Sequence, residues 1–129
     1  MDEANRGNYK FNNSGNKVDM SKFNYLNKSN CYEVPTVDDN EFYSDTCESF
    51  LTMGFSKDEI TAIWKMLSAV LNLGNSEVTQ NGSDGEQQCQ FEDSVYFKNV
   101  IELLGVDQAE LVGGMTLQVS SLYTKNRAK

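Results

Sequence analysis

Few side chains in this sequence have the type and spacing that catalysis requires. Asp38 with Asp39, and Asp58 with Glu59, are neighbouring carboxylates, a pairing that can divide general acid and general base work in an active site. The sequence contains no histidine, so the most common general base is absent. It also contains neither a G-x-x-x-x-G-K-S/T phosphate loop nor a G-x-G-x-x-G motif. The paired carboxylates are therefore the main catalytic candidates, and local structure must decide their role.

The candidate nucleophiles lack activating partners. No base is spaced to activate Ser56 or Ser68, and a cysteine nucleophile would lack its usual histidine. The three cysteines, Cys31, Cys47 and Cys89, are an odd number at wide spacings and form no recognisable disulfide or zinc pattern. We expect ordinary reduced cysteines, no metal and no cofactor in this chain.

The carboxylates fit better at the starts of helices. In D-D-N-E (38–41), S-K-D-E (56–59) and D-Q-A-E (107–110), a short oxygen-bearing side chain precedes a glutamate by three residues. Such a side chain caps an unpaired backbone N–H, and the glutamate favours the positive end of the helix. Each cap is worth about 1 kcal/mol. The carboxylate pairs are thus expected to be structural.

Four helices follow from the caps and the apolar spacing, over about 39–53, 57–73, 94–104 and 108–115. The helix over 57–73 has the clearest apolar stripe, and neighbouring apolar residues widen it. It predicts a central helix buried on most sides, with Trp64 in the core. The stripe consists of Ile60, Ile63, Trp64, Leu67, Val70 and Leu71.

The remaining segments predict little further structure. Residues 1–20 are polar, with isolated apolar positions such as Tyr9, and we expect a flexible or poorly ordered segment. Residues 75–92 read as an exposed loop. The alternation over 117–123 predicts an edge strand. The fold class is therefore mainly α, with capped helices around a central apolar helix and a C-terminal edge strand.

The charge is unevenly distributed over the chain. The net charge is −8, and residues 36–116 carry fifteen acidic side chains against three basic ones, which disfavours nucleic acid as a partner. No apolar run approaches the roughly 18 residues of a membrane span. The N-terminus has no apolar secretory region, so we expect a cytoplasmic protein. The basic residues Lys125, Arg127 and Lys129 gather at the C-terminus.

A series of short motifs resembles the myosin motor domain. Each motif alone is weak, but their order and spacing agree with myosin heads across residues 23–111. The motifs are F-N-Y-L-N-K-S-N-C (23–31), V-D-D (37–39) with Phe42 and Thr46 after it, M-G-F-S-K-D-E (53–59), I-W-K-M-L-S-A-V-L-N-L-G-N (63–75) and L-L-G-V-D (103–107) with E-L (110–111).

The resemblance implies a parent and a role. Members of the family are actin-activated ATPases that use ATP and magnesium to move along filaments. Residues 21–129 would be an incomplete part of such a P-loop motor domain, in the upper actin-cleft region between the two switch segments. This piece would be a jaw that couples nucleotide state to actin binding. Its partners would be the actin filament and the remainder of the head, which implies a cytoskeleton-associated location.

The sequence also departs from the family. The phosphate loop, both switch segments and the relay helix are missing, so we expect no ATP binding or hydrolysis by this chain alone. Asn72 stands where the family has histidine. After Thr116 the chain lacks the family's Pro-Arg loop that touches actin, which leaves Lys125, Arg127 and Lys129 as the candidate actin contacts.

Two other functions remain open at this point. Met53-Gly54-Phe55 resembles the signature loop of ubiquitin-associated helical modules, which grip ubiquitin with it. Against this interpretation, the helix after the loop is long and apolar on most sides, which would leave no exposed binding face. An enzyme of another type is the third alternative, and the missing histidine and nucleotide loop argue against it.

Overall fold

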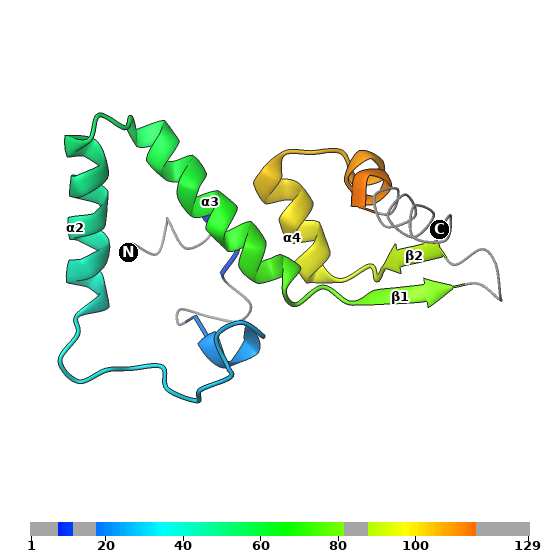
Figure 1. The fold of residues 1–129 in the computed structure, drawn as a ribbon, viewed down its shortest axis with the longest axis horizontal. Helices are drawn as coiled ribbons and strands as arrows, with labels where there is room; N and C mark the ends of the chain where they lie inside the picture. Colours follow the sequence, from blue (N-terminus) through cyan, green and yellow to red (C-terminus); the bar gives the residue numbers. More distant parts are fainter. Residues whose placement is uncertain (1–7, 12–17, 82–87, 116–129) are drawn as a thin grey trace, which may run out of the picture.

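The computed structural model describes residues 8–11, 18–81 and 88–115 of the chain. The described part is mainly helical, as predicted, and it also contains one small sheet; Figure 1 shows α4 beside the C-terminal half of α3. Residues 108–115 are also helical. The elements are the 3-10 helix η1 (Met20–Lys22), α2 (Asp39–Thr52), α3 (Lys57–Leu73), β1 (Val78–Asn81), β2 (Gln88–Phe91) and α4 (Val95–Leu104).

The predicted caps are present at all three helix starts. The Asp38 carboxylate accepts the backbone N–H groups of Asn40 and Glu41 at the start of α2. At the start of α3, Ser56 and Glu59 form a complete capping box. Asp107 likewise accepts from the two backbone N–H groups at positions 109 and 110. Helix boundaries predicted from the sequence are therefore accurate to within about two residues.

The corner between α2 and α3 is short because of Gly54. Gly54 adopts φ +94°, a left-handed conformation that glycine reaches without a steric penalty. Phe55 follows and packs its ring edge-on against Phe50, with centroids 5.4 Å apart. The two helices diverge from this corner, so that α2 stands away from the rest of the molecule (Figure 1).

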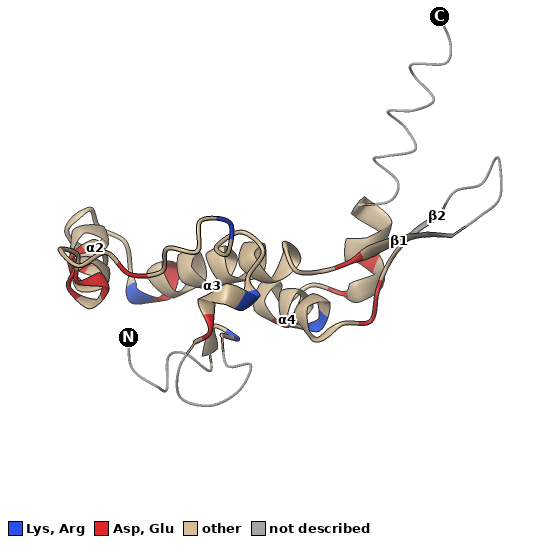
Figure 2. Ribbon diagram, turned by 90° about the horizontal axis from the view of Figure 1, so that it is seen from below, with Lys and Arg blue, Asp and Glu red and all other residues tan. Residues whose placement is uncertain are grey.

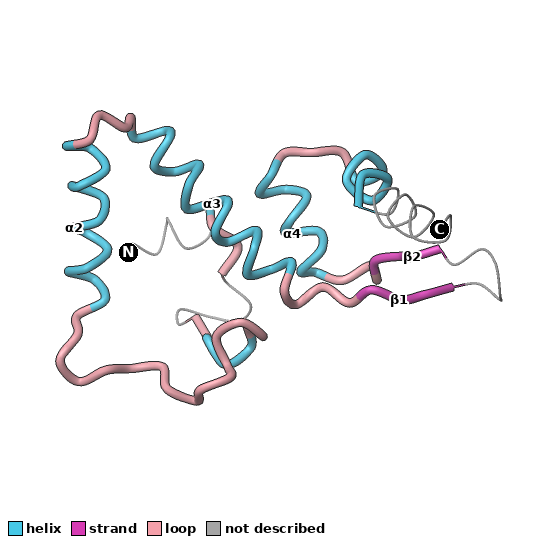
Figure 3. Tube along the Cα trace, in the orientation of Figure 1, coloured by secondary structure: helices cyan, strands magenta, loops and turns pink. Residues whose placement is uncertain are grey.

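The predicted loop over 75–92 is wrong in part. Residues 78–81 and 88–91 pair as an antiparallel hairpin, with Val78 opposite Phe91 (Figure 3). The strands are only four residues long and mainly polar, so they carry little of the apolar alternation that marks a strand in a sequence. The base of the hairpin is anchored because Phe91 stacks on Phe97 of α4, with centroids 4.5 Å apart.

The core lies where α3, α4 and the N-terminal segment meet. Helix α2 contributes no buried residue to it. Tyr9, which the sequence presents as an isolated apolar position, is buried there, and Lys10 pairs with Glu102 of α4 at 2.6 Å. The buried apolar side chains are Tyr9, Phe23, Ile60, Ala69, Phe97, Val100 and Leu103.

A second N-terminal segment clasps the C-terminal end of α3. Asn75 accepts the backbone N–H of Asn24 at 2.8 Å and donates to the carbonyl of Lys22 at 2.6 Å. Asn24 in turn donates to the carbonyl of Gly74 at 3.0 Å. The ring of Tyr25 lies against Gly74, where an added Cβ would come within 2.3 Å of it. Residues 22–25 therefore close off α3 as a clasp.

The predicted edge strand over 117–123 lies outside the described residues. The division at residue 20 between an N-terminal segment and the rest stays a prediction.

Removing the clasp should lower the stability of the chain. Asn75→Ala deletes two hydrogen bonds and should cost about 1–3 kcal/mol of unfolding free energy, whereas Asn24→Ala deletes one and should cost about 1 kcal/mol. Urea denaturation followed by circular dichroism measures both. Lys28→Ala, an exposed change nearby, is the control and should stay within about 0.5 kcal/mol. Equal losses in all three variants would contradict the clasp.

The capping box should make stability depend on pH. The backbone N–H and hydroxyl of Ser56 donate to the Glu59 carboxylate and lower its pKa. A group with a lowered folded pKa contributes stability above its unfolded pKa of about 4.3, and the contribution is lost as pH falls through the folded value. The difference in free energy of unfolding between the wild type and Glu59→Gln, measured by urea denaturation, should therefore be smaller at pH 3 than at pH 6.

Candidate interaction surface

The apolar stripe of α3 is partly exposed. Ile60 is buried, but Leu67 and Val70 are 51% and 50% exposed, and Met66 beside them is 61% exposed. The prediction that this helix is buried on most sides is therefore wrong for the described chain. We define the stripe surface as Ile63, Met66, Leu67 and Val70.

The buried side of α3 consists of Ile60 and three short residues, two of them polar. Ser68 and Asn72 are fully buried at i and i+4, and Ala69 lies next to them. Short side chains let the neighbouring segments approach α3 closely, so α4 and the N-terminal segment occupy this side. Met66, Leu67 and Val70 are consequently turned away from the core.

Hydrogen bonds satisfy the buried polar groups of Ser68 and Asn72. The Ser68 hydroxyl donates to the carbonyl of Tyr9, which fixes the N-terminal segment on α3. The Asn72 amide donates to the carbonyl of Ser68 at 2.9 Å and accepts from the Asn99 amide at 3.0 Å. Because buried polar groups are costly unless paired, this chain of bonds selects one arrangement of three segments. Its only sequence signal is the spacing of Ser68 and Asn72.

Trp64 lies at the edge of the core, where the sequence placed it inside. Its side chain is half-buried, and its ring meets that of Tyr43 in α2 with centroids 5.1 Å apart. No described residue accepts a hydrogen bond from its buried Nε1. Burial and a hydrogen bond with Cys47 raise the pKa of Tyr43 to about 12. The pair of aromatic rings links α2 to α3.

The catalytic candidates are not assembled into a site. Asp38 and Glu59 cap different helices, and no group of three or more His, Cys, Asp or Glu within the described ranges is placed to hold a metal ion. Cys31 and Cys47 are free thiols. Lys125, Arg127 and Lys129 lie outside the described residues.

The chain matches one protein family over almost its whole length. The model of the myosin head (motor domain) family matches residues 5–127. The chain belongs to the myosin head family. This establishes the parentage that the motif series indicated.

Individual relatives agree with the family. Myosin-51 of Schizosaccharomyces pombe (strain 972 / ATCC 24843) is 38% identical over 91 residues, which are 70% of this chain and 6% of that protein. Myosin-J heavy chain of Dictyostelium discoideum is 33% identical over 97 residues, 74% of this chain and 4% of that protein. Unconventional myosin ID of Drosophila melanogaster is 32% identical over 101 residues, 78% and 9%. This myosin head segment thus spans less than a tenth of each.

The ubiquitin-associated alternative loses its basis. Its motif, Met53-Gly54-Phe55, falls inside the stretch that the myosin head family matches. Helix α3 nevertheless leaves part of its apolar face exposed, so the expectation that no binding face would remain was wrong. In the described part of this myosin head segment, no helix is both long and apolar enough to cross a membrane.

Removing the buried hydroxyl of Ser68 should destabilise the segment. Ser68→Ala leaves the Tyr9 carbonyl without this donor and should cost about 1–3 kcal/mol in urea unfolding. Ser49→Ala is the matched control. The Ser49 hydroxyl also donates to a backbone carbonyl, at 2.8 Å, but that carbonyl belongs to the same helix and Ser49 is exposed. The control should change stability by about 0.5 kcal/mol or less. Equal effects would show that the Tyr9 contact is unimportant.

Proposed function

We propose that this myosin head segment forms one jaw of an actin-binding cleft and couples the nucleotide state of a motor to actin binding. The observation that carries the proposal is the stripe surface of α3, an apolar surface on which Met66, Leu67 and Val70 are each at least half exposed among the described residues. Contiguous apolar surface of this kind marks a contact with another body. The rest of a myosin head is the natural partner, because the relatives are more than ten times as long as the matched stretch.

Covering the exposed side chains of the stripe surface would contribute free energy to binding. Full burial of a Leu, Val or Met side chain contributes about 1.5–3 kcal/mol relative to exposure. Met66, Leu67 and Val70 are each at least half exposed, so covering them would contribute roughly 1 kcal/mol apiece. A firm attachment to the remainder of the head is therefore energetically reasonable.

A jaw must also move as a rigid unit. Helix α3 has 17 residues and is about 25 Å long. The Ser56–Glu59 box stabilises its first turn, and the Asn24–Asn75 clasp attaches its C-terminal end to residues 22–25. Coupling between distant sites requires an element that transmits a displacement without absorbing it, and a long helix with a capped start and an attached end is suited to that requirement.

ATP and magnesium would be bound elsewhere in the parent head. This chain has no phosphate loop, and its described residues offer no metal-binding group, so the residues present do not fit either ligand. The proposed role is mechanical. On charge grounds Lys125, Arg127 and Lys129 remain the candidate contacts to an acidic actin surface, with a cytoskeletal location as the consequence.

A chimera tests the jaw role. The corresponding segment of Myosin-51 would be replaced by residues 23–111 of this chain, and ATP hydrolysis measured with and without actin filaments. We expect activation by actin in the chimera and a loss of at least tenfold in Leu67→Asp, because a buried unpaired charge cannot be accommodated. In the 129-residue chain the same change should cost about 1 kcal/mol or less, since Leu67 is half exposed.

Leu67→Met is the matched control for the chimera. It keeps an apolar side chain of similar volume, so activation by actin should be retained. Full activation in the Leu67→Asp chimera would refute the proposed contact of the stripe with the rest of the head.

A further inference from the structure

Helix α2 has a second exposed apolar surface, formed by two large side chains. Phe42, Ser49 and Met53 lie at i, i+7 and i+11, which places them on one face of the helix. Phe42 and Met53 are 62% and 65% exposed. Three helical turns separate these two large apolar side chains, a distance of about 16 Å.

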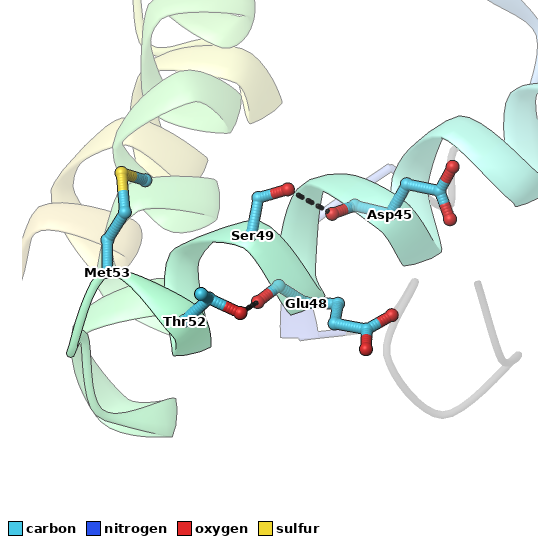
Figure 4. Close-up of a pocket in the computed structure, with 5 residues that line it drawn as sticks. All are labelled: Asp45, Glu48, Ser49, Thr52 and Met53. Carbon is cyan, nitrogen blue, oxygen red and sulfur yellow. Dashed lines mark hydrogen bonds between the residues drawn. The ribbon is translucent and has the colours of Figure 1, made fainter.

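Two carboxylates of α2, those of Asp45 and Glu48, lie in the stretch between the two apolar side chains. Asp45 and Glu48, with Ser49, Thr52 and Met53, line an open hollow on α2 (Figure 4). The Ser49 hydroxyl donates to the carbonyl of Asp45 at 2.8 Å, and the Thr52 hydroxyl to that of Glu48 at 3.0 Å. Both hydroxyls are thus satisfied within the helix. The carboxylates are the polar groups of the hollow left to meet a partner.

The charge of this face is not balanced locally. Residues 29–56 contain six acidic side chains and no lysine or arginine. Neither Asp45 nor Glu48 forms an ion pair with a residue that the structure describes. Figure 2 shows acidic and no basic residues on α2. Two copies of this face would repel each other, so a second copy of the chain is a poor occupant.

We propose that the outer face of α2, formed by Phe42, Asp45, Glu48 and Met53, binds a basic amphipathic helix of a partner protein. Phe42 and Met53 contact the apolar stripe of that helix, and the carboxylates pair with the lysines or arginines flanking the stripe. A helix of about 11–15 residues spans the two apolar side chains. An apolar face that docks on exposed side chains is a common mode of peptide recognition, and charge complementarity fixes its orientation.

The test uses a fluorescent, acetylated and amidated 16-residue peptide of leucine and lysine with one apolar face. Its anisotropy is measured against the 129-residue chain. We expect saturable one-to-one binding with Kd on the order of 10 µM. Phe42→Ser, and separately the double variant Asp45→Asn/Glu48→Gln, should each weaken binding at least tenfold. Circular dichroism should show unchanged folding, since these side chains are exposed.

Matched controls separate this site from other causes of binding. Glu77→Gln/Glu92→Gln removes the same number of exposed charges elsewhere and should leave Kd within twofold. A loss equal to that of the α2 variants would indicate general charge attraction and overturn the proposal. Leu67→Ser should also leave Kd within twofold, and a tenfold loss there would place the peptide on the stripe of α3 instead.

Two further outcomes concern the occupant. A scrambled peptide of the same composition, which lacks an apolar face, should not saturate, and equal binding would overturn the proposal. A chain ending at Met115 should bind with unchanged Kd. A tenfold gain would show that the chain's own basic residues at 125, 127 and 129 occupy the face, and the partner would then be rejected.

Discussion

The close packing of α3 through Ser68, Ala69 and Asn72 determines how the rest of the segment is arranged. A buried hydroxyl and a buried amide tolerate few alternatives, because each must keep its hydrogen-bond partner. The hydroxyl holds the N-terminal segment, and the amide holds α4 through Asn99. Once these two neighbours are seated, the orientation of α3 about its own axis is fixed.

That orientation explains a feature which is unusual for a helix of this composition. Part of the apolar face of α3, formed by Met66, Leu67 and Val70, is directed outward, whereas the polar side chains of Ser68 and Asn72 lie in the core beside Ile60 and Ala69. In a self-contained domain burial of those exposed apolar side chains would be more stable, because apolar burial is the main source of folding free energy. In a member of the myosin head family that covers only a small part of its relatives' length, the arrangement is consistent with an internal part whose outer side belongs to a larger body.

Local patterns in the sequence predicted the helices, whereas the packing depends on contacts between residues that are far apart in the chain. The caps Asp38, Ser56 and Asp107 mark the starts of their helices in the sequence, because a cap is a contact between residues two or three apart. The hairpin was missed because its strands are short and polar, and its anchor is the contact of Phe91 with Phe97. Likewise, nothing local distinguishes which side of α3 meets Tyr9. The apolar stripe itself was identified from its spacing, but its burial was predicted wrongly at Leu67 and Val70, because its direction depends on partners far away in the chain.

The corner at Gly54 and Phe55 has a consequence for the length of the chain. Only four residues, 53–56, separate α2 from α3, and Phe55 is held against Phe50. Each residue added to a helix advances its side chains by about 100°. A single insertion at the corner would therefore alter the phase between the two helices and separate Tyr43 from Trp64. A side chain at Gly54 would be strained by its φ of +94°, and the number of residues in the corner keeps the outer faces of α2 and α3 in a constant relative orientation.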